Sequence, residues 1–289
     1  MTAALRPRRS VLYMPSSNTR ALEKAKSIAC DALIFDLEDA VAPDAKPMAR
    51  DQACAAARSG AYGRREVTIR CNGLDTMWGA DDLTAAAVSG ADAVVIPKVE
   101  SVATLDEISD RLDEAGAPAE MMIWAMIETP TAIADIRDLA AHRRVGVLVM
   151  GTNDLVKELH VGTPADRFPL IPHLAAAVLG AREADKVILD GVYNDVRDDD
   201  GFLAEAQQGH QLGFDGKTLI HPRQVEPTNE VWSPSEAEID HARRVIDAFE
   251  AAQARGEGVV TVDGRMIENL HVDHAQRILA IAEAIADLI

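Results

Sequence analysis

The sequence predicts a closed (β/α)₈ barrel over residues 1–257, followed by a C-terminal extension over residues 258–289. Eight apolar segments alternate with eight helical segments, which is the repeat of this fold. The apolar segments are almost continuously hydrophobic, as expected for parallel strands that are buried on both faces. The alternative is a doubly wound open sheet, which usually has fewer repeats and a glycine-rich first turn. No GxGxxG or Walker A pattern follows the first strand.

The first four units follow one pattern: a short apolar run stops at a polar residue, and a segment predicted as a helix comes next. The fourth helix carries the clearest boundary signals, a Ser at its start and a Gly at its end. The strands are predicted at 10–15, 32–39, 66–72 and 93–100, and the helices at 18–29, 43–59, 76–90 and 101–116.

The last four units repeat the pattern, except that a longer loop is expected between the sixth strand and its helix. The strands are predicted at 121–129, 145–154, 187–195 and 216–222, and the helices at 131–142, 172–185, 201–213 and 235–255.

The tail reads as a short hairpin over residues 258–269 and an amphipathic helix over residues 270–289. The barrel is already complete at this point, so the tail is expected to pack outside it. It could cover its own barrel mouth or that of a neighbouring subunit.

The composition limits the class of protein. The 289 residues are 48% hydrophobic but only 4% aromatic, so Ala, Val, Leu and Ile must fill a large core. A formal charge of −18 disfavours nonspecific binding of nucleic acid, which depends on neutralising phosphates. An anionic ligand would therefore need a local basic pocket.

The cysteines and the apolar segments indicate a cytoplasmic protein. Cys30, Cys54 and Cys71 form no CxxC pair, so reduced thiols are expected rather than disulfides or a zinc knuckle. Cys71 beside Arg70 is interpreted as a buried structural thiol, not as a nucleophile. No segment approaches about 18 uninterrupted apolar residues, so no membrane span is expected. The apolar stretch after the basic N-terminus is too short for a signal peptide.

Polar residues at the strand ends are the candidate functional residues, because a barrel gathers the C-terminal ends of all its strands around one mouth. For any single acid the alternative is a helix cap or a solvated loop position, above all for Asp39, Glu100 and Asp195. The strand-end residues are Asp36, Glu38, Asp39, Arg70, Asn72, Lys98, Glu100, Glu128, Asn153, Asp154, Asp195 and His221.

Glu128 and Asp154 stand apart because they end two strands that are adjacent in the predicted barrel. Neighbouring strands lie ~4.8 Å apart, so two such carboxylates can share one cation. Two carboxylates with several waters suit Mg²⁺, with Mn²⁺ as the alternative ion. No cluster of His or Cys offers a zinc site.

Arg70 is the predicted electrophilic partner of this metal site. Its guanidinium could hold a carboxylate or a developing enolate oxygen, and the metal would act as a Lewis acid on substrate oxygens. A salt bridge from Arg70 to Glu38 or Asp39 is the alternative. Metal and arginine at one mouth indicate enolate chemistry, such as aldol or Claisen cleavage or its reverse.

Motifs along nearly the whole chain resemble the citrate lyase β-subunit-like branch of the HpcH/HpaI aldolase superfamily. Within this branch, the sequence is similar to malyl-CoA lyases and malyl-CoA thioesterases. The motifs that carry the resemblance include LIFDLEDAVAPDAK (33–46), IRCNGLDTMWGADDL (69–83), MIETP (126–130), MGTNDL (150–155), GFDGKTLIHPRQV (213–225) and DGRMIENLHVDHAQRIL (263–279).

The resemblance implies Mg²⁺ on Glu128 and Asp154, with Asn153 beside them in the substrate site and Arg70 near the substrate thioester. It also implies a homo-oligomer, a trimer or a hexamer, in which the C-terminal extension covers a neighbouring subunit's active site. The residues that match contacts to coenzyme A (CoA) are Tyr13, Met14, Lys24, Ile220 and His221, and the nearby Arg20 is a candidate contact to its phosphates.

One position departs from the lyase pattern. Lyases of this family have a catalytic Asp where this chain has Glu268, one methylene longer. A misplacement of ~1 Å can slow proton transfer by ~10²-fold. The surrounding ENLHV resembles the thioesterase branch, where the carboxylate could activate water or attack the thioester directly.

The expected function is therefore Mg²⁺-dependent hydrolysis of (S)-malyl-CoA-type thioesters to malate and CoA. Three alternatives stay open. Glu268 could simply replace the Asp of a carbon–carbon lyase that yields acetyl-CoA and a 2-oxo acid. The chain could be a citrate lyase β-like subunit, or a metal-dependent aldolase of pyruvate-derived acids.

Overall fold

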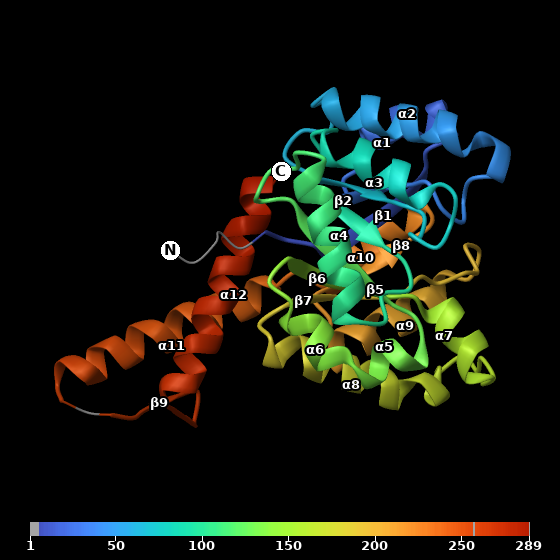
Figure 1. Cartoon of the computed structure of the whole chain (residues 1–289). Helices are drawn as coiled ribbons and strands as arrows, with labels where there is room; N and C mark the ends of the chain where they lie inside the picture. Colours follow the sequence, from blue (N-terminus) through green and yellow to red (C-terminus); the bar gives the residue numbers. More distant parts are fainter. Residues whose placement is uncertain (1–5, 257, 289) are drawn as a thin grey trace. The chain divides into compact units, whose positions relative to one another are not determined.

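The computed structural model describes residues 6–256 and 258–288 (Figure 1). Eight parallel strands form a closed barrel in sequence order. The strands are β1 (Ser10–Pro15), β2 (Ala32–Asp36), β3 (Glu66–Arg70), β4 (Ala93–Ile96), β5 (Met122–Ile127), β6 (Val145–Met150), β7 (Val187–Asp190) and β8 (Gly216–Leu219).

Helices follow the strands, as the alternating sequence pattern predicts. They are α1 (Thr19–Ala25), α2 (Lys46–Arg58), α3 (Gly79–Ala87), α4 (Val102–Glu114), α5 (Pro130–Ala134), α6 (Ile136–Ala141), α7 (Thr152–Leu159), α8 (Ile171–Glu183), α9 (Asp199–Leu212) and α10 (Val225–Val231), with 3₁₀ turns η1 (Pro43–Ala45), η2 (Phe168–Leu170) and η3 (Pro222–Gln224).

Pairing of the first and last strands closes the barrel. Ser10 of β1 lies opposite Lys217 of β8, and Leu12 lies opposite Leu219, while the other edge of β1 pairs with β2. The predicted (β/α)₈ barrel is confirmed, and the open doubly wound sheet is excluded because no edge strand remains.

Except for β1, which has its predicted bounds, the strands end earlier than the sequence predicts. In β6 the ladder stops at Met150, and helix α7 begins at Thr152 without the expected longer loop. Asp154 therefore lies in the first turn of α7 and not at a strand end, where a negative side chain complements the helix dipole. The polar residues of this turn resemble a strand end in the sequence, which is why the helix was missed.

Alternate strand residues fill the barrel interior, because successive side chains of a strand point to opposite faces. Most of them are small or β-branched, and Trp124 is the one large ring of the cluster, which fits the low aromatic content. Two steps beyond Ile34 and Met126, the same alternation reaches Asp36 and Glu128. The interior cluster is Val11, Ala32, Ile34, Ala93, Val95, Trp124, Met126, Val147, Val149 and Leu189.

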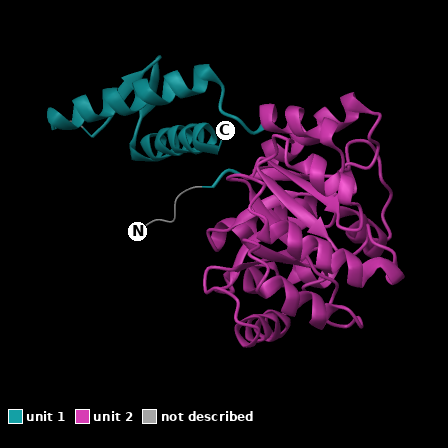
Figure 2. Ribbon diagram, turned by 90° about the horizontal axis from the view of Figure 1, so that it is seen from above, with its two compact units in different colours: residues 1–7, 232–289 teal, residues 8–231 magenta. Residues whose placement is uncertain are grey.

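The chain divides into two compact units, one of residues 8–231 and one of residues 1–7 with 232–289 (Figure 2). We term residues 232–288 the C-terminal arm. The expected boundary at residue 257 falls later than this division, because helix α11 (Glu236–Ala254) packs with the arm's own apolar core.

The arm is a helical hairpin with a small β-hairpin between its helices. After α11 come β9 (Val260–Val262), β10 (Arg265–Ile267) and α12 (Asn269–Leu288). Asp263 and Gly264 connect the two strands, and both have positive φ, as a two-residue Asp-Gly turn requires. Among the residues that the structure describes, none of the helices combines the length and apolar character that crossing a bilayer demands.

Candidate active site at the barrel mouth

A cavity of about 290 Å³ brings together residues that follow most of the strands of the barrel. Eight residues expected at the site from the sequence line it: Tyr13, Asp36, Asp39, Arg70, Glu128, Asn153, Asp154 and Ile220. The rest of the lining consists of Ala40, Met126, Met150, Gly151, Val192, Asn194 and Thr218.

Arg70 is held by three carboxylates. Its Nε and Nη2 donate to the two oxygens of Asp36 at 2.7 and 2.6 Å, which is a bidentate pair between buried side chains. Its Nη1 lies 2.7 Å from Glu38 and 3.3 Å from Asp39. The salt bridges expected as the alternative for Arg70 are therefore present, and Asp36 is the stronger partner that the sequence did not reveal.

Arg70 nevertheless remains part of the cavity wall. Its guanidinium lies over the ring of Tyr13, 4.9 Å from the ring centroid, in a cation–π contact. Burial disfavours its charge, but Asp36, together with Tyr13 and Glu38, outweighs this and holds the pKa of Arg70 well above its usual range. The side chain is a fixed cation in the mouth.

Glu128 is buried, with 3% of its surface exposed. Its Oε1 accepts the backbone N–H of Lys98 at 2.8 Å, and Lys98 adopts a left-handed backbone with φ of 49°. Gly151 lies so close that an added Cβ would stand 2.3 Å from the Glu128 Oε2. The MGTND motif therefore needs glycine here because any side chain would displace the carboxylate.

Burial raises the pKa of Glu128 to about 7, and the neighbouring Asp154 adds to this, against the opposing Lys98 N–H and Arg70. Burial likewise raises the pKa of Glu38 to about 7, with Asp39 and Glu128 adding to it and Arg70 opposing. Partial burial works against the charge of Lys98, but the carboxylates of Asp154, Glu128, Glu38 and Asp39 together outweigh it and raise the pKa of Lys98.

The mouth has an excess of negative charge. Asp36, Glu38, Asp39, Glu128 and Asp154 interact with two cationic side chains, Arg70 and Lys98. Within the described part of the chain, no group of three or more His, Cys, Asp or Glu side chains forms a metal site. Two carboxylates, with water and substrate oxygens completing the shell, fit Mg²⁺ and not a structural zinc ion.

An asparagine pair forms part of the cavity wall. Asn153 Nδ2 donates to Asn194 Oδ1 at 3.2 Å, and Asn194 Nδ2 donates back to Asn153 Oδ1 at 2.7 Å. Asn194 was not among the predicted site residues, because its neighbour Asp195 is the last residue of the predicted strand and therefore the candidate. Asp195 is a turn residue that accepts the N–H of Arg197, which matches its alternative interpretation.

The remaining candidates lie outside the cavity lining. Met14 follows Tyr13 in β1 and is on the opposite face of the strand. Arg20 and Lys24 are exposed on α1, and His221 accepts the N–H of Arg223 as a cap of η3. Glu268 belongs to the arm, between β10 and α12.

Two other candidates are structural. Asn72 is buried and hydrogen-bonded to Asp82 and Lys46. Burial raises the pKa of the Cys71 thiol well above its usual range, which fits the structural role expected for it.

A second ionic cluster, which the sequence did not reveal, joins β7, β8 and α9. Lys217 is fully buried and contacts Asp190 at 3.2 Å and Glu205 at 2.8 Å. Arg167 contacts the other oxygen of Asp190 at 2.7 Å. Burial would raise the pKa of Asp190, but Lys217 and Arg167 outweigh it, so the pKa is lowered. The available signal was the Lys within the predicted strand 216–222.

Comparison with known proteins identifies the family. The family model described as HpcH/HpaI aldolase/citrate lyase matches residues 9–222. The chain is 50% identical over 280 residues to the (3S)-malyl-CoA thioesterase of Cereibacter sphaeroides, covering 97% of this chain and 96% of that protein. It is 36% identical over 284 residues to citrate lyase subunit beta of Escherichia coli, covering 96% and 94% of the two chains.

Solved structures agree with this. The CitE protein of Mycobacterium tuberculosis, in complex with magnesium, acetoacetate and coenzyme A, superimposes with a TM-score of 0.78 and 26% identity. The match covers 97% of this chain and all of that one. The barrel, the motifs and these similarities lead to one conclusion: the chain belongs to the HpcH/HpaI aldolase/citrate lyase family.

Proposed function

We propose that this protein is a Mg²⁺-dependent thioesterase that hydrolyses (S)-malyl-CoA-type thioesters to malate and CoA. The observation that carries the proposal is the excess of carboxylates at the barrel mouth, with Glu128 and Asp154 facing one cavity beside Arg70. The 50% identity to a (3S)-malyl-CoA thioesterase supports the choice of substrate and reaction.

Glu128 and Asp154 would hold the ion, Mg²⁺ or alternatively Mn²⁺. Once bound, the ion would supply Lewis-acid polarisation of the oxygens of the malyl group. Arg70, fixed by Asp36, would orient the acyl group near the thioester, and Asn153 would contact its polar end. Since Arg70 is already in place, no side-chain ordering is needed when substrate arrives.

The CoA moiety would lie along the rim near β1, α1 and β8. The candidates are the residues that match CoA contacts in the family, and the exposed Arg20 and Lys24 supply the positive charge that its phosphates require. Ile220 is 40% exposed at the cavity edge, where it would contact the pantetheine chain.

Glu268 would act as the general base. Its carboxylate would take a proton from water, the water oxygen would bond to the thioester carbon, and the carbon–sulfur bond would break. The thiolate would leave with the proton that Glu268 accepted. This carboxylate is expected to act in a neighbouring subunit of a cytoplasmic trimer or hexamer, with the arm over that subunit's mouth.

The surface around Glu268 supports such docking. Met266 is 59% exposed and Leu270 is 62% exposed, and they flank Glu268 in the sequence. Apolar side chains next to a half-buried acid are suited to covering the mouth of another subunit and excluding water from it.

A second candidate is carbon–carbon cleavage of the same thioester to glyoxylate and acetyl-CoA. The observation that favours it is that a carboxylate is kept at position 268, together with the 36% identity to a citrate lyase beta subunit. In this reaction Glu268 would transfer the proton and Arg70 would stabilise the enolate.

A product assay tests the two candidates. Purified protein is mixed with (S)-malyl-CoA and Mg²⁺, and free thiol, malate, glyoxylate and acetyl-CoA are followed together. Thiol and malate without glyoxylate are expected. Glyoxylate and acetyl-CoA without free thiol would replace the thioesterase by a lyase. Glu268→Ala should abolish turnover and leave Mg²⁺ binding intact, and full activity of this variant would remove Glu268 from the mechanism.

A further inference from the structure

We infer that His271 is a positioning residue that holds the backbone of Glu268 and thereby fixes the position from which its carboxylate acts in the reaction. The inference rests on the proposed function, in which that carboxylate moves the proton.

Glu268 occupies the junction between β10 and α12. The residue before it, Ile267, is 3% exposed and anchored in the core of the arm. The carbonyl of Glu268 accepts the N–H groups of His271 at 3.0 Å and Val272 at 3.4 Å, so Glu268 is the N-cap of α12. Its own N–H donates to Nδ1 of His271 at 3.1 Å.

This arrangement is one half of a capping box. In the complete box the N-cap side chain accepts the N–H of the third helical residue, and a Glu or Gln there accepts the N–H of the N-cap. Here the imidazole of His271 provides the second contact. The carboxylate of Glu268 makes no hydrogen bond or ion pair with any residue that the structure describes.

The consequence is a division of tasks between two side chains. Without an acceptor at position 271, the N–H of Glu268 would lose its partner, and the junction of β10 and α12 would lose a contact that fixes its backbone. The His271 ring therefore fixes the backbone position from which the Glu268 carboxylate acts.

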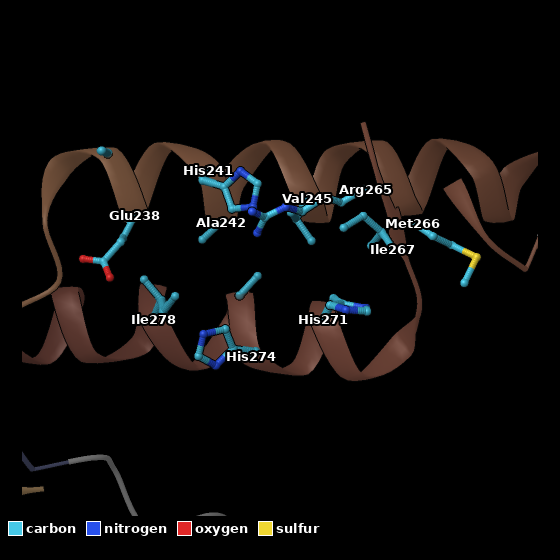
Figure 3. Close-up of a pocket in the computed structure, with 12 residues that line it drawn as sticks. Glu238, His241, Ala242, Val245, Arg265, Met266, Ile267, His271, His274 and Ile278 are labelled. Carbon is cyan, nitrogen blue, oxygen red and sulfur yellow. The ribbon is translucent and has the colours of Figure 1, made fainter. Parts of the chain in front are cut away.

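The neighbouring histidines provide internal controls. His271 and His274 lie on α12 and line a groove of about 460 Å³ between α11 and α12 (Figure 3). His241, on α11, contacts Asp263 at 3.1 Å. Neither His241 nor His274 hydrogen-bonds to Glu268 among the contacts of the described residues. They share the groove with His271 but not its contact.

The test compares His271→Phe with His271→Gln in the full-length protein, with (S)-malyl-CoA and Mg²⁺ as the probe. Phe keeps a ring but has no acceptor, and Gln is an acceptor used in capping boxes. We expect kcat to fall about tenfold in His271→Phe, with KM within about twofold. His271→Gln should recover most of the loss, and His274→Ala should match the wild type. His271→Met repeats the comparison with Gln if the Phe variant does not fold.

Three results would overturn the inference: wild-type kcat in the variants without an acceptor, equal losses in the Gln and Met variants, or a loss confined to KM. Glu268→Gln separates this from the proposed function. If Glu268→Gln is fully active, the proposed role of Glu268 fails. If Glu268→Gln is inactive while His271→Phe is unimpaired, only the positioning role fails.

Discussion

The barrel contains two buried ionic clusters, and they differ in charge balance. At the β7–β8 side, Lys217 and Arg167 are matched by Asp190 and Glu205. At the mouth, Arg70 and Lys98 interact with five carboxylates. There, burial raises the pKa of both Glu38 and Glu128 to about 7, and neighbouring carboxylates add to the increase. In the first cluster the pKa of Asp190 is instead lowered, although it is fully buried.

Burial alone therefore does not separate a structural ion network from a functional one. A balanced network holds segments together, whereas an unbalanced one needs a further cation to become neutral.

Lys217→Met should have the largest effect on folding. It leaves Asp190 and Glu205 with Arg167 alone, and loss of a partner from a buried ion pair costs about 3–5 kcal/mol. Urea unfolding measures the free energy, and Mg²⁺ should not restore it. Arg223→Ala, which removes the exposed pair with Asp199, is the control and should change stability by less than about 0.5 kcal/mol. A loss under about 1 kcal/mol in Lys217→Met would contradict the structural role.

Glu128→Gln should have the opposite combination of effects, with a large loss of Mg²⁺ binding and no loss of folding stability. Mg²⁺ binding and turnover should fall by at least ~10²-fold, because the ion loses a carboxylate in a buried site. The metal-free protein should be no less stable than the wild type, since the change removes one surplus charge. Calorimetric Mg²⁺ titration and unfolding in EDTA measure the two effects. Destabilisation comparable to that of Lys217→Met would show that the mouth is also a structural network.

Gly151→Ala should weaken Mg²⁺ binding by about tenfold, through displacement of Glu128 by the new Cβ. Gly162→Ala is the matched control, because an added Cβ there meets nothing within 4 Å. Equal Mg²⁺ affinity in the two variants would mean that Glu128 can move aside without loss.

The smallest expected effect is a dependence of the Mg²⁺ stabilisation on pH. Glu128 and Glu38 have a pKa of about 7 in the folded chain, against an ordinary value of about 4.3. The folded state therefore binds more protons within this window, and stability without metal should fall as pH rises from about 4.3 to 7. Since Mg²⁺ favours the ionised form, it should raise Tm by about 2–4 °C more at pH 8 than at pH 5.5. Thermal unfolding with Mg²⁺ and with EDTA checks this, and an Mg²⁺ effect equal at both pH values would contradict it.

Much of the fold could be predicted because its signals are local. Each strand is an apolar run, and sequential parallel strands in a barrel must be neighbours. The predicted strand order therefore placed Glu128 and Asp154 on adjacent β–α units. In the structure both residues line one cavity. The element ends could not be fixed, because the TND of residues 152–154 suits a strand end and a first helical turn equally well.

Contacts between side chains that are far apart in the sequence were harder to predict. Asp36 meets Arg70 because both lie at the ends of paired strands, in a register that sequence alone does not give. Arg167 reaches Asp190 from a loop with a left-handed backbone, φ of 42°, which no pattern at that position indicates. The sequence shows that Ile34 and Asp36 lie on the same face of their strand, but it does not show that this face points into the barrel.

Pairing of β1 with β8 also has a consequence for how the protein is made. Strand β1 is synthesised first and β8 last, so the barrel cannot close until residue 219 has left the ribosome. At 5–20 residues per second, roughly 10–40 s separate the two strands. During that time one edge of β1 has no strand to pair with, and the nascent chain exposes backbone groups that another chain could bind. Until Lys217 is available to pair with Ser10, this open edge of β1 is therefore a place where the nascent chain can aggregate.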